Sequence, residues 1–153
     1  MGIEIERKFL VCSDDWRILG TPVHYAQGYL VADGIRNVRV RIAGEEGFLT
    51  VKGASKGMSR LEFEYSIPFD EAVMMLRLSA TPVIEKFRTR ILYHGKIWEV
   101  DEFEGENKGL IMAEIELTSE EETFAVPHWI GEEVTSDLRY YNSRLAIQPF
   151  RNW

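Results

Sequence analysis

Fully charged side chains recur at every second position in several short segments that are otherwise apolar. In the first segment, Glu4, Glu6 and Lys8 alternate with Ile5 and with Arg7. Alternate residues of a β-strand point to the same face, so each segment should carry its charges on one face and most of its apolar residues on the other. The same alternation occurs at Arg39 and Arg41, at Thr50 and Lys52, at Arg60, Glu62 and Glu64, at Lys86, Arg88 and Arg90, at Glu99 and Asp101, and at Glu114 and Glu116.

The grouping of these charges by sign indicates bound ions. Like charges two residues apart on a strand lie about 7 Å from each other and repel, as at Arg39 with Arg41 and at Glu114 with Glu116. Carboxylates suit a hard divalent cation such as Mg²⁺, which prefers oxygen ligands. Guanidinium groups suit phosphate, which they bind through paired hydrogen bonds. The alternative is an antiparallel sheet whose charged faces simply meet solvent, with no function attached.

The segments that carry these charges are predicted to be antiparallel strands, separated by turns such as Asp33-Gly34 and His94-Gly95. Eight antiparallel strands can close into a barrel with a small interior, and the charged faces could then point inward. We therefore predict a mainly β fold (α+β), an eight-stranded antiparallel closed barrel or tunnel with a charged interior and a few covering helices. The predicted strands are residues 3–11, 24–32, 36–43, 47–52, 60–67, 83–93, 97–104 and 110–117.

Three segments carry helix signals instead. Asp70 is a candidate N-cap for residues 71–78, and Ser119 with Glu122 forms a candidate capping box for a short helix. After Thr135 and Ser136, apolar residues recur at helical spacing and predict one C-terminal amphipathic helix. These helices are expected to cover the apolar outer face of the barrel.

Length and composition limit the remaining possibilities. The 153 residues are expected to form a single domain over 1–153, and a net charge of −7 argues against nucleic acid as a partner. No apolar run is long enough for a membrane span, and the charged start of the chain is unlike a signal peptide. The one cysteine, Cys12, excludes an internal disulfide framework. A cytoplasmic location is therefore expected.

The charged segments also resemble a known family. The run from Glu4 to Val11 matches the Glu-x-Glu-x-Lys signature of the CYTH superfamily, the triphosphate tunnel metalloenzymes. Further segments resemble the tunnel strands of that family in the same order, so the resemblance covers nearly the whole chain. They are Gln27-Gly28-Tyr29-Leu30, Val38-Arg39-Val40-Arg41, Thr50-Val51-Lys52, Arg60-Leu61-Glu62-Phe63-Glu64, Glu85-Lys86-Phe87-Arg88, Glu99-Val100-Asp101, Glu114-Ile115-Glu116 and, at the C-terminal element, Asp137-Leu138-Arg139-Tyr140-Tyr141-Asn142.

The resemblance, which is to the short bacterial tripolyphosphatase branch, implies an activity and roles for particular residues. The activity is hydrolysis of a phosphoanhydride bond of a linear triphosphate with Mg²⁺ or Mn²⁺, most simply tripolyphosphate to pyrophosphate and phosphate. Glu4, Glu6 and Lys8 would then be catalytic, with Tyr29 and Lys86 as a further candidate pair. The implied metal ligands are Glu4, Glu6 and Glu116, with Glu62, Glu64, Asp101 and Glu114 as additional ones. The implied phosphate-binding residues are Lys8, Arg39, Arg41, Lys52, Lys86, Arg88 and Arg139.

Several alternatives remain open at the level of sequence. The tunnel could take an organic triphosphate, as a thiamine triphosphatase or a class IV-type adenylate cyclase does, although a short chain leaves little material for an organic pocket. It could also be a polyphosphate-binding module without turnover. Small members of the family suggest a homodimer. The fold, the opposed charges and the resemblance together favour a small-molecule triphosphatase.

Overall fold

The eight predicted strands are all present, each within one residue of its predicted bounds, in the computed structural model, which describes residues 2–153. A ninth strand, which the sequence did not indicate, follows near the C-terminus. The strands are β1 (Ile3–Val11), β2 (Val23–Ala32), β3 (Asn37–Ala43), β4 (Glu46–Lys52), β5 (Ser59–Ile67), β6 (Ile84–Tyr93), β7 (Lys96–Phe103), β8 (Ile111–Glu116) and β9 (Ile130–Glu133). The helices are η1 (Asp15–Leu19), α1 (Phe69–Leu76), η2 (Gly105–Asn107), η3 (Leu138–Tyr140), α2 (Asn142–Leu145) and η4 (Phe150–Asn152), where η marks a 3₁₀ turn.

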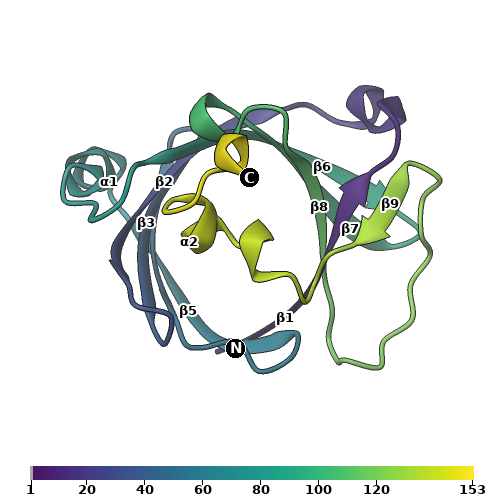
Figure 1. Cartoon of the computed structure of the whole chain (residues 1–153), viewed down its shortest axis with the longest axis horizontal. Helices are drawn as coiled ribbons and strands as arrows, with labels where there is room; N and C mark the ends of the chain where they lie inside the picture. The colour runs from purple at the N-terminus through teal and green to yellow at the C-terminus, as the bar shows by residue number, and fades with distance from the viewer. Residues whose placement is uncertain (1) are drawn as a thin grey trace.

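Strand β1 closes the sheet into a barrel because its two halves pair with different partners. Neighbouring strands run antiparallel in the order β5-β4-β3-β2-β6-β7-β8-β1, and Ile3–Ile5 of β1 pair with β5 at the other end of that order. Glu6–Leu10 of β1 pair with β8, and β9 joins the last residues of β1. In the view of Figure 1 the strands form a ring. The predicted eight-stranded closed barrel is therefore confirmed.

The main apolar core lies outside the barrel wall. Trp98 and Ile115, which point outward from β7 and β8, pack with Trp16 of η1 and with Trp129, and all four are buried. On another part of the wall, α1 packs against the outer face of β3 and β4. Gly47 permits this approach, since a Cβ there would lie 2.7 Å from the Cβ of Ala72. The apolar faces thus point outward, as expected from the alternation, and the interior is left to the charges.

A second core closes one end of the barrel. The C-terminal segment enters the ring in Figure 1, where Leu145 and Ala146 pack against Tyr29, Phe103 and Met112. Phe103 and Met112 lie on strand faces of β7 and β8 that carry charges nearer the middle of the barrel. These two strands therefore change from charged to apolar residues on that face toward this end, and the C-terminal segment seals it by burying that apolar surface.

This arrangement corrects the prediction of one C-terminal helix on the outer face. The segment forms η3 and α2, separated by Tyr141, whose φ of −75° and ψ of 137° are extended rather than helical. Asp137 caps η3 by accepting a hydrogen bond from the backbone N–H of Arg139. Two short turns fit inside a curved barrel mouth, whereas one straight helix would not follow it.

The other two helix predictions also need correction. Helix α1 begins at Phe69 after Pro68 and ends at Leu76, so Asp70 lies in its first turn and is not its N-cap. Residues 119–122 form a turn and no helix. There, Glu122 accepts hydrogen bonds from the backbone N–H and hydroxyl of Thr118 and forms an ion pair with Lys96, with a 2.6 Å Nζ–Oε2 distance. Within residues 2–153, none of the helices is long and apolar enough to cross a membrane.

Candidate functional site

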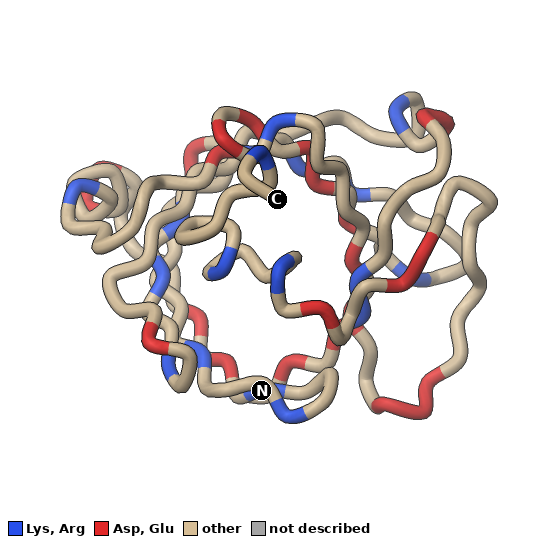
Figure 2. The backbone as a smooth tube through the Cα atoms, in the orientation of Figure 1, with Lys and Arg blue, Asp and Glu red and all other residues tan. Residues whose placement is uncertain are grey.

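The barrel encloses a charged cavity of about 360 Å³. Backbone positions of both charge signs surround it in Figure 2. Nearly all of the sequence-predicted site residues line it: Glu4, Glu6, Lys8, Tyr29, Arg39, Arg41, Lys52, Glu62, Glu64, Lys86, Arg88, Glu114 and Glu116. The strand alternation that placed these residues on one face also placed that face inward. Asp101 and Arg139 are the two exceptions and are described below.

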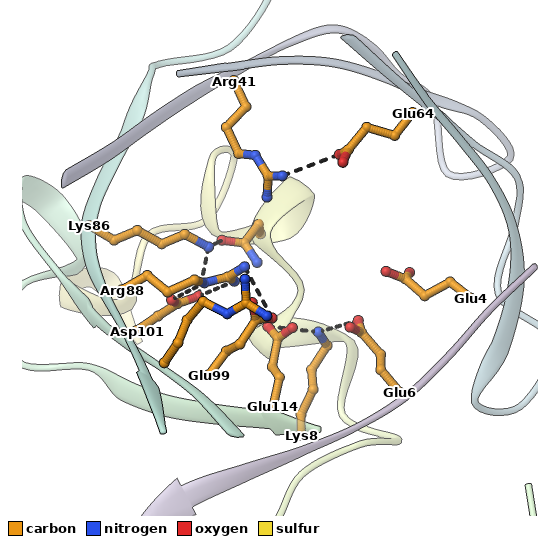
Figure 3. Close-up of polar contacts among 12 residues, drawn as sticks. Glu4, Glu6, Lys8, Arg41, Glu64, Lys86, Arg88, Glu99, Asp101 and Glu114 are labelled. Atoms are coloured by element: carbon orange, nitrogen blue, oxygen red, sulfur yellow. Dashed lines mark hydrogen bonds and ion pairs between the residues drawn. The ribbon is translucent and has the colours of Figure 1, made fainter. Parts of the chain in front are cut away.

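One wall of the cavity is acidic and is cross-linked by two lysines. Lys8 on β1 is 3% exposed, and its Nζ lies 2.7 Å from Glu6 Oε1 and 3.2 Å from Glu114 Oε1. Burial lowers the pKa of Lys8, but the carboxylates of Glu114 and Glu6 outweigh it and raise that pKa above the usual value. Lys52 on β4 likewise pairs with Glu4 at 3.1 Å and, at the same distance, with a carboxylate on β5, that of Glu62. Both lysines are held with their charge between carboxylates (Figure 3 shows Lys8).

The acidic wall carries more negative charge than these lysines neutralise. Burial, followed by repulsion from Glu114, raises the pKa of Glu6 to about 7. Burial, followed by the charges of Glu4 and Glu62, also raises the pKa of Glu116. A divalent cation at this wall would relieve the repulsion and release the proton.

The opposite wall is basic, and its positively charged side chains lie close together. Arg41 Nη2 lies 3.2 Å from Glu64 Oε2, and Arg39 Nη2 lies 3.5 Å from the same oxygen. The Nε atoms of both arginines are buried and lack a hydrogen-bond partner within the described chain. Burial, followed by the charges of Arg39 and Arg88, lowers the pKa of Arg41 to about 10. The single carboxylate of Glu64 therefore leaves Arg39 and Arg41 short of negative charge, as residues of a polyanion site would be.

Asp101 joins the two further cations of the basic wall and does not itself line the cavity. Its Oδ2 lies 2.7 Å from Lys86 Nζ and its Oδ1 lies 2.7 Å from Arg88 Nε, while its exposure is 0%. Burial raises the pKa of Asp101, but Arg88 and Lys86 outweigh burial and lower that pKa. Asn142 of α2 accepts a further hydrogen bond from Lys86 Nζ at 3.2 Å. Both carboxylate oxygens face these cations, and this geometry fits a residue that positions Lys86 and Arg88 better than it fits a metal ligand.

The charge state of Lys86 should limit substrate binding at alkaline pH. Burial is the largest influence on it and lowers its pKa to about 8, although Asp101 acts in the opposite direction. Below that pH Lys86 is protonated and would attract the phosphate oxygens of the substrate that the family resemblance implies, and above it the charge is lost. The KM for a triphosphate should therefore rise as the pH passes about 8. In Lys86→Arg the rise should disappear, because a guanidinium stays charged. Steady-state kinetics at several pH values measure this, and an identical pH dependence in the variant would contradict it.

Tyr29 and the C-terminal segment form the closed end of the cavity. The hydroxyl oxygen of Tyr29 accepts a hydrogen bond from Gln27 Nε2 at 3.1 Å, and the Tyr29 side chain is 4% exposed. The ring centroid of Tyr141 lies 5.0 Å from Lys8 Nζ and 5.8 Å from Arg60 Cζ. Sequence reasoning missed Tyr141 and Asn142 as cavity residues, although both stand in the segment that carries the family resemblance.

The structure does not support the prediction that Arg139 binds phosphate. Its guanidinium is 2.7 Å from Asp137 Oδ2 and its Cζ is 4.7 Å from the ring centroid of Trp153, outside the cavity. The prediction came from the resemblance of residues 137–142 to the C-terminal element of the family. In the extended turn that is present, Tyr141 and Asn142 face the cavity and Arg139 faces the outside.

The residues of the acidic wall fit a hydrated divalent cation. Among the described residues no three Asp, Glu, His or Cys side chains converge into a closed metal cage. Mg²⁺ does not require one, because it usually retains several waters and binds proteins through one or two carboxylates. Glu6 and Glu116, whose pKa values are raised by burial and then by neighbouring carboxylates, are suitable donors of this kind.

Comparisons with known proteins agree with this geometry. The model of the CYTH domain matches residues 2–145. A protein of Acetivibrio thermocellus named inorganic triphosphatase is 52% identical over 154 aligned residues, which cover 100% of this chain and 99% of that protein. An inorganic triphosphatase of Nitrosomonas europaea is 39% identical, with 94% of this chain and 97% of that protein covered.

Solved structures give the same result. A crystal structure of an inorganic triphosphatase superposes with a TM-score of 0.65 and 35% sequence identity, and the match covers 94% of this chain and 97% of that one. The residues that the family model matches, 2–145, include all nine strands of this fold. The chain therefore belongs to the CYTH domain family.

Proposed function

We propose that this protein is an inorganic triphosphatase that hydrolyses tripolyphosphate to pyrophosphate and phosphate with a divalent cation, Mg²⁺ or Mn²⁺. The observation that carries the proposal is the pair of opposed walls, one acidic and one basic, in a single cavity. Relatives named inorganic triphosphatase at 52% and 39% identity over nearly the whole chain support it.

The proposed roles follow from the position of each side chain. The cation would be held at the acidic wall by Glu4, Glu6 and Glu116, with Glu62 and Glu114 of the same wall and Glu64 of the basic wall as further donors. When bound there, it neutralises phosphate oxygens and lowers the charge that an incoming nucleophile meets. The phosphate chain would be held by Lys8, Lys52, Arg39, Arg41, Lys86 and Arg88. Asp101 keeps Lys86 and Arg88 in place.

In hydrolysis these residues would act mainly by positioning the water and the phosphate chain. A water held by the carboxylates attacks the terminal phosphorus, a new P–O bond forms to the water oxygen, and the anhydride P–O bond breaks. Pyrophosphate leaves with the bonding electron pair, and the water proton passes to a carboxylate or to solvent. The arginines and lysines neutralise the charge that develops on the phosphoryl oxygens. Tyr29, at the closed end with Lys86, is placed to contact the substrate there.

The character of the cavity favours an inorganic substrate. Two of its aromatic side chains, Tyr25 and Phe48, already stack with Arg41, at 5.2 and 5.4 Å from the guanidinium carbon to the ring centroids. The C-terminal segment occupies the other end, so little apolar surface remains for a base or a thiazolium ring. The many carboxylates argue against a binding module without turnover, because each added negative charge weakens anion binding in the absence of a cation.

A side-by-side assay of substrates tests the proposed function. Purified protein with Mg²⁺ or Mn²⁺ should release phosphate from tripolyphosphate with a kcat/KM at least about tenfold above that for ATP or thiamine triphosphate, a difference of about 1.4 kcal/mol. Phosphate release measured by a colorimetric assay, with cyclic AMP followed in parallel, gives the comparison. Preference for an organic triphosphate would contradict the inorganic assignment, and binding without any release would favour the binding module.

We also propose a homodimer formed through the outer face of β1, β4 and β5. Five apolar side chains are exposed together there: Ile3 (62%), Val51 (39%), Leu61 (54%), Phe63 (45%) and Tyr65 (59%). Val51 is paired with Phe63 and Ile3 with Leu61, so these side chains are neighbours on one surface. Contiguous apolar patches of this kind are typical of protein interfaces. A second copy presenting the same patch would bury it.

Sedimentation velocity tests the dimer. Phe63→Ser should shift the protein to the monomer, while Ile18→Ser, which changes a more exposed apolar residue on η1, should leave the distribution unchanged. A monomeric wild-type protein at all concentrations would contradict the proposal.

A cytoplasmic location is proposed as well. The single cysteine, Cys12, is exposed and free. Its thiol donates a hydrogen bond to the carbonyl oxygen of His128, with a 3.3 Å Sγ–O distance. A free exposed thiol is typical of reducing compartments.

A further inference from the structure

A side pocket of about 250 Å³ lies next to the closed end of the charged cavity. Asn37, Arg60, Tyr141 and Ser143 line both the cavity and this pocket. These four side chains therefore form the partition between the two spaces. The rest of the pocket is formed by the β2–β3 turn, the β4–β5 loop and the C-terminal segment, including Arg144.

The side pocket is positively charged although the protein as a whole carries a net charge of −7. Arg60 and Arg144 line it, and none of its described lining residues is Asp or Glu. The basic residues that line only the main cavity differ in this respect, since each has a carboxylate at ion-pair distance: Lys8, Arg39, Arg41, Lys52, Lys86, Arg88 and Arg90. Neither Arg60 nor Arg144 forms an ion pair with any residue among 2–153. The guanidinium charges of Arg60 and Arg144 are therefore available to a ligand.

Arg60 is held in place by neutral groups. Its Nε donates a hydrogen bond to the carbonyl oxygen of Gly53 at 3.2 Å. With its amide oxygen turned toward the guanidinium, Asn37 accepts from Nη2 at 3.0 Å. These contacts fix the guanidinium without neutralising it, so its position is set before any anion arrives. Two serine hydroxyls, of Ser55 and Ser143, are further donors in the same lining.

We propose that this pocket binds one orthophosphate ion and that the phosphate released by hydrolysis leaves the closed end of the cavity through it. The proposal rests on the proposed function only in that hydrolysis supplies the phosphate. Two guanidinium groups and two hydroxyls match the donors that a tetrahedral oxyanion requires, and the absence of carboxylates from the described lining excludes a divalent cation. Tyr141, which lines both spaces, would then lie between the cavity in which hydrolysis is proposed to occur and the pocket proposed to bind phosphate.

Titration of sodium phosphate into the metal-free protein, followed by calorimetry, tests the site. The wild-type protein should show two classes of phosphate site, one in the cavity and one in the side pocket. Arg144→Gln should weaken the pocket class about tenfold and leave the cavity class, as expected for loss of one charged hydrogen-bond donor. Arg41→Gln, which changes only the cavity, should do the reverse. Arg151→Gln, which removes an exposed arginine paired with Glu106 elsewhere on the protein, should bind like the wild type.

Product inhibition tests the exit role. Phosphate inhibition of tripolyphosphate hydrolysis should weaken about tenfold in Arg144→Gln, with the KM for tripolyphosphate within about twofold of the wild type. Titration or inhibition curves of Arg144→Gln that coincide with those of the wild type would overturn the proposal. Failure of the wild type to hydrolyse tripolyphosphate would overturn the proposed function instead, and would leave the phosphate titration as an independent test of the pocket.

Discussion

Glu6→Gln is expected to lower kcat/KM for tripolyphosphate about a thousandfold, a loss of about 4 kcal/mol of transition-state stabilisation. Glu6 is the carboxylate whose pKa is raised to about 7, so it is the carboxylate that would most readily exchange its proton for a metal ion. Gln keeps the shape of the side chain and can still accept a hydrogen bond from Lys8, but it removes the charge. The affinity for Mg²⁺ or Mn²⁺, measured by titration, should fall together with phosphate release.

The same variant has an informative effect on stability. A carboxyl group whose pKa is higher in the folded protein than in the unfolded chain stabilises the fold fully at low pH, and that contribution is lost as the pH rises toward about 7. Without metal, raising the pH toward about 7 should therefore lower the melting temperature of the wild type more than it lowers that of Glu6→Gln.

Glu133→Gln is the matched control. Glu133 is also a strand glutamate paired with a cation, at 2.6 Å from Arg7, but it lies on β9 outside the cavity. Its removal should change kcat/KM less than about twofold and stability by about 0–1 kcal/mol, as is usual for partly exposed pairs. Equal losses of activity in both variants would show that Glu6 acts through the fold and not through a metal ion.

Asp101→Asn is expected to have the second largest effect, through both stability and catalysis. The substitution leaves Lys86 and Arg88 facing an amide in a fully buried position. Loss of one partner of a buried ion cluster costs about 3–5 kcal/mol, which corresponds to a fall in melting temperature of about 10 °C for a chain of this length. At a temperature where the variant is folded, kcat should fall about a hundredfold because the two cations proposed to bind phosphate lose their common support.

The metal affinity of the Asp101 variant distinguishes its two possible roles. If Asp101 positions Lys86 and Arg88, the affinity for Mg²⁺ in Asp101→Asn should stay within about twofold of the wild type while kcat falls. If Asp101 is a metal ligand, as the family resemblance suggested, the affinity should fall as in Glu6→Gln. Tripolyphosphate should raise the melting temperature of Asp101→Asn more than that of the wild type, because the polyanion supplies the missing negative charge.

The strands and their charged faces could be predicted from the sequence because their signal is local. Side chains alternate across a strand with a period of two, so Glu4, Glu6 and Lys8 share a face whatever the rest of the chain does. The helix predictions were weaker because helices of one or two turns have little intrinsic stability and take their limits from packing. Segment 135–146 shows this, since contacts inside the barrel mouth divide it into η3 and α2 around the extended Tyr141.

The amino-acid sequence was sufficient to show which residues share a face, how many strands can close the barrel, and that opposite charges are segregated along it. Which of these charges meet depends on the three-dimensional fold. Lys52 of β4 joins Glu4 of β1 because β5 closes the ring between them, and Asp101 turns both oxygens to β6 instead of to the cavity. Such pairings depend on strand order and register across the whole barrel, and no local pattern specifies those. The physical reason is that a strand's alternation fixes directions within a few residues, whereas ion pairs depend on distances that only closure of the sheet sets.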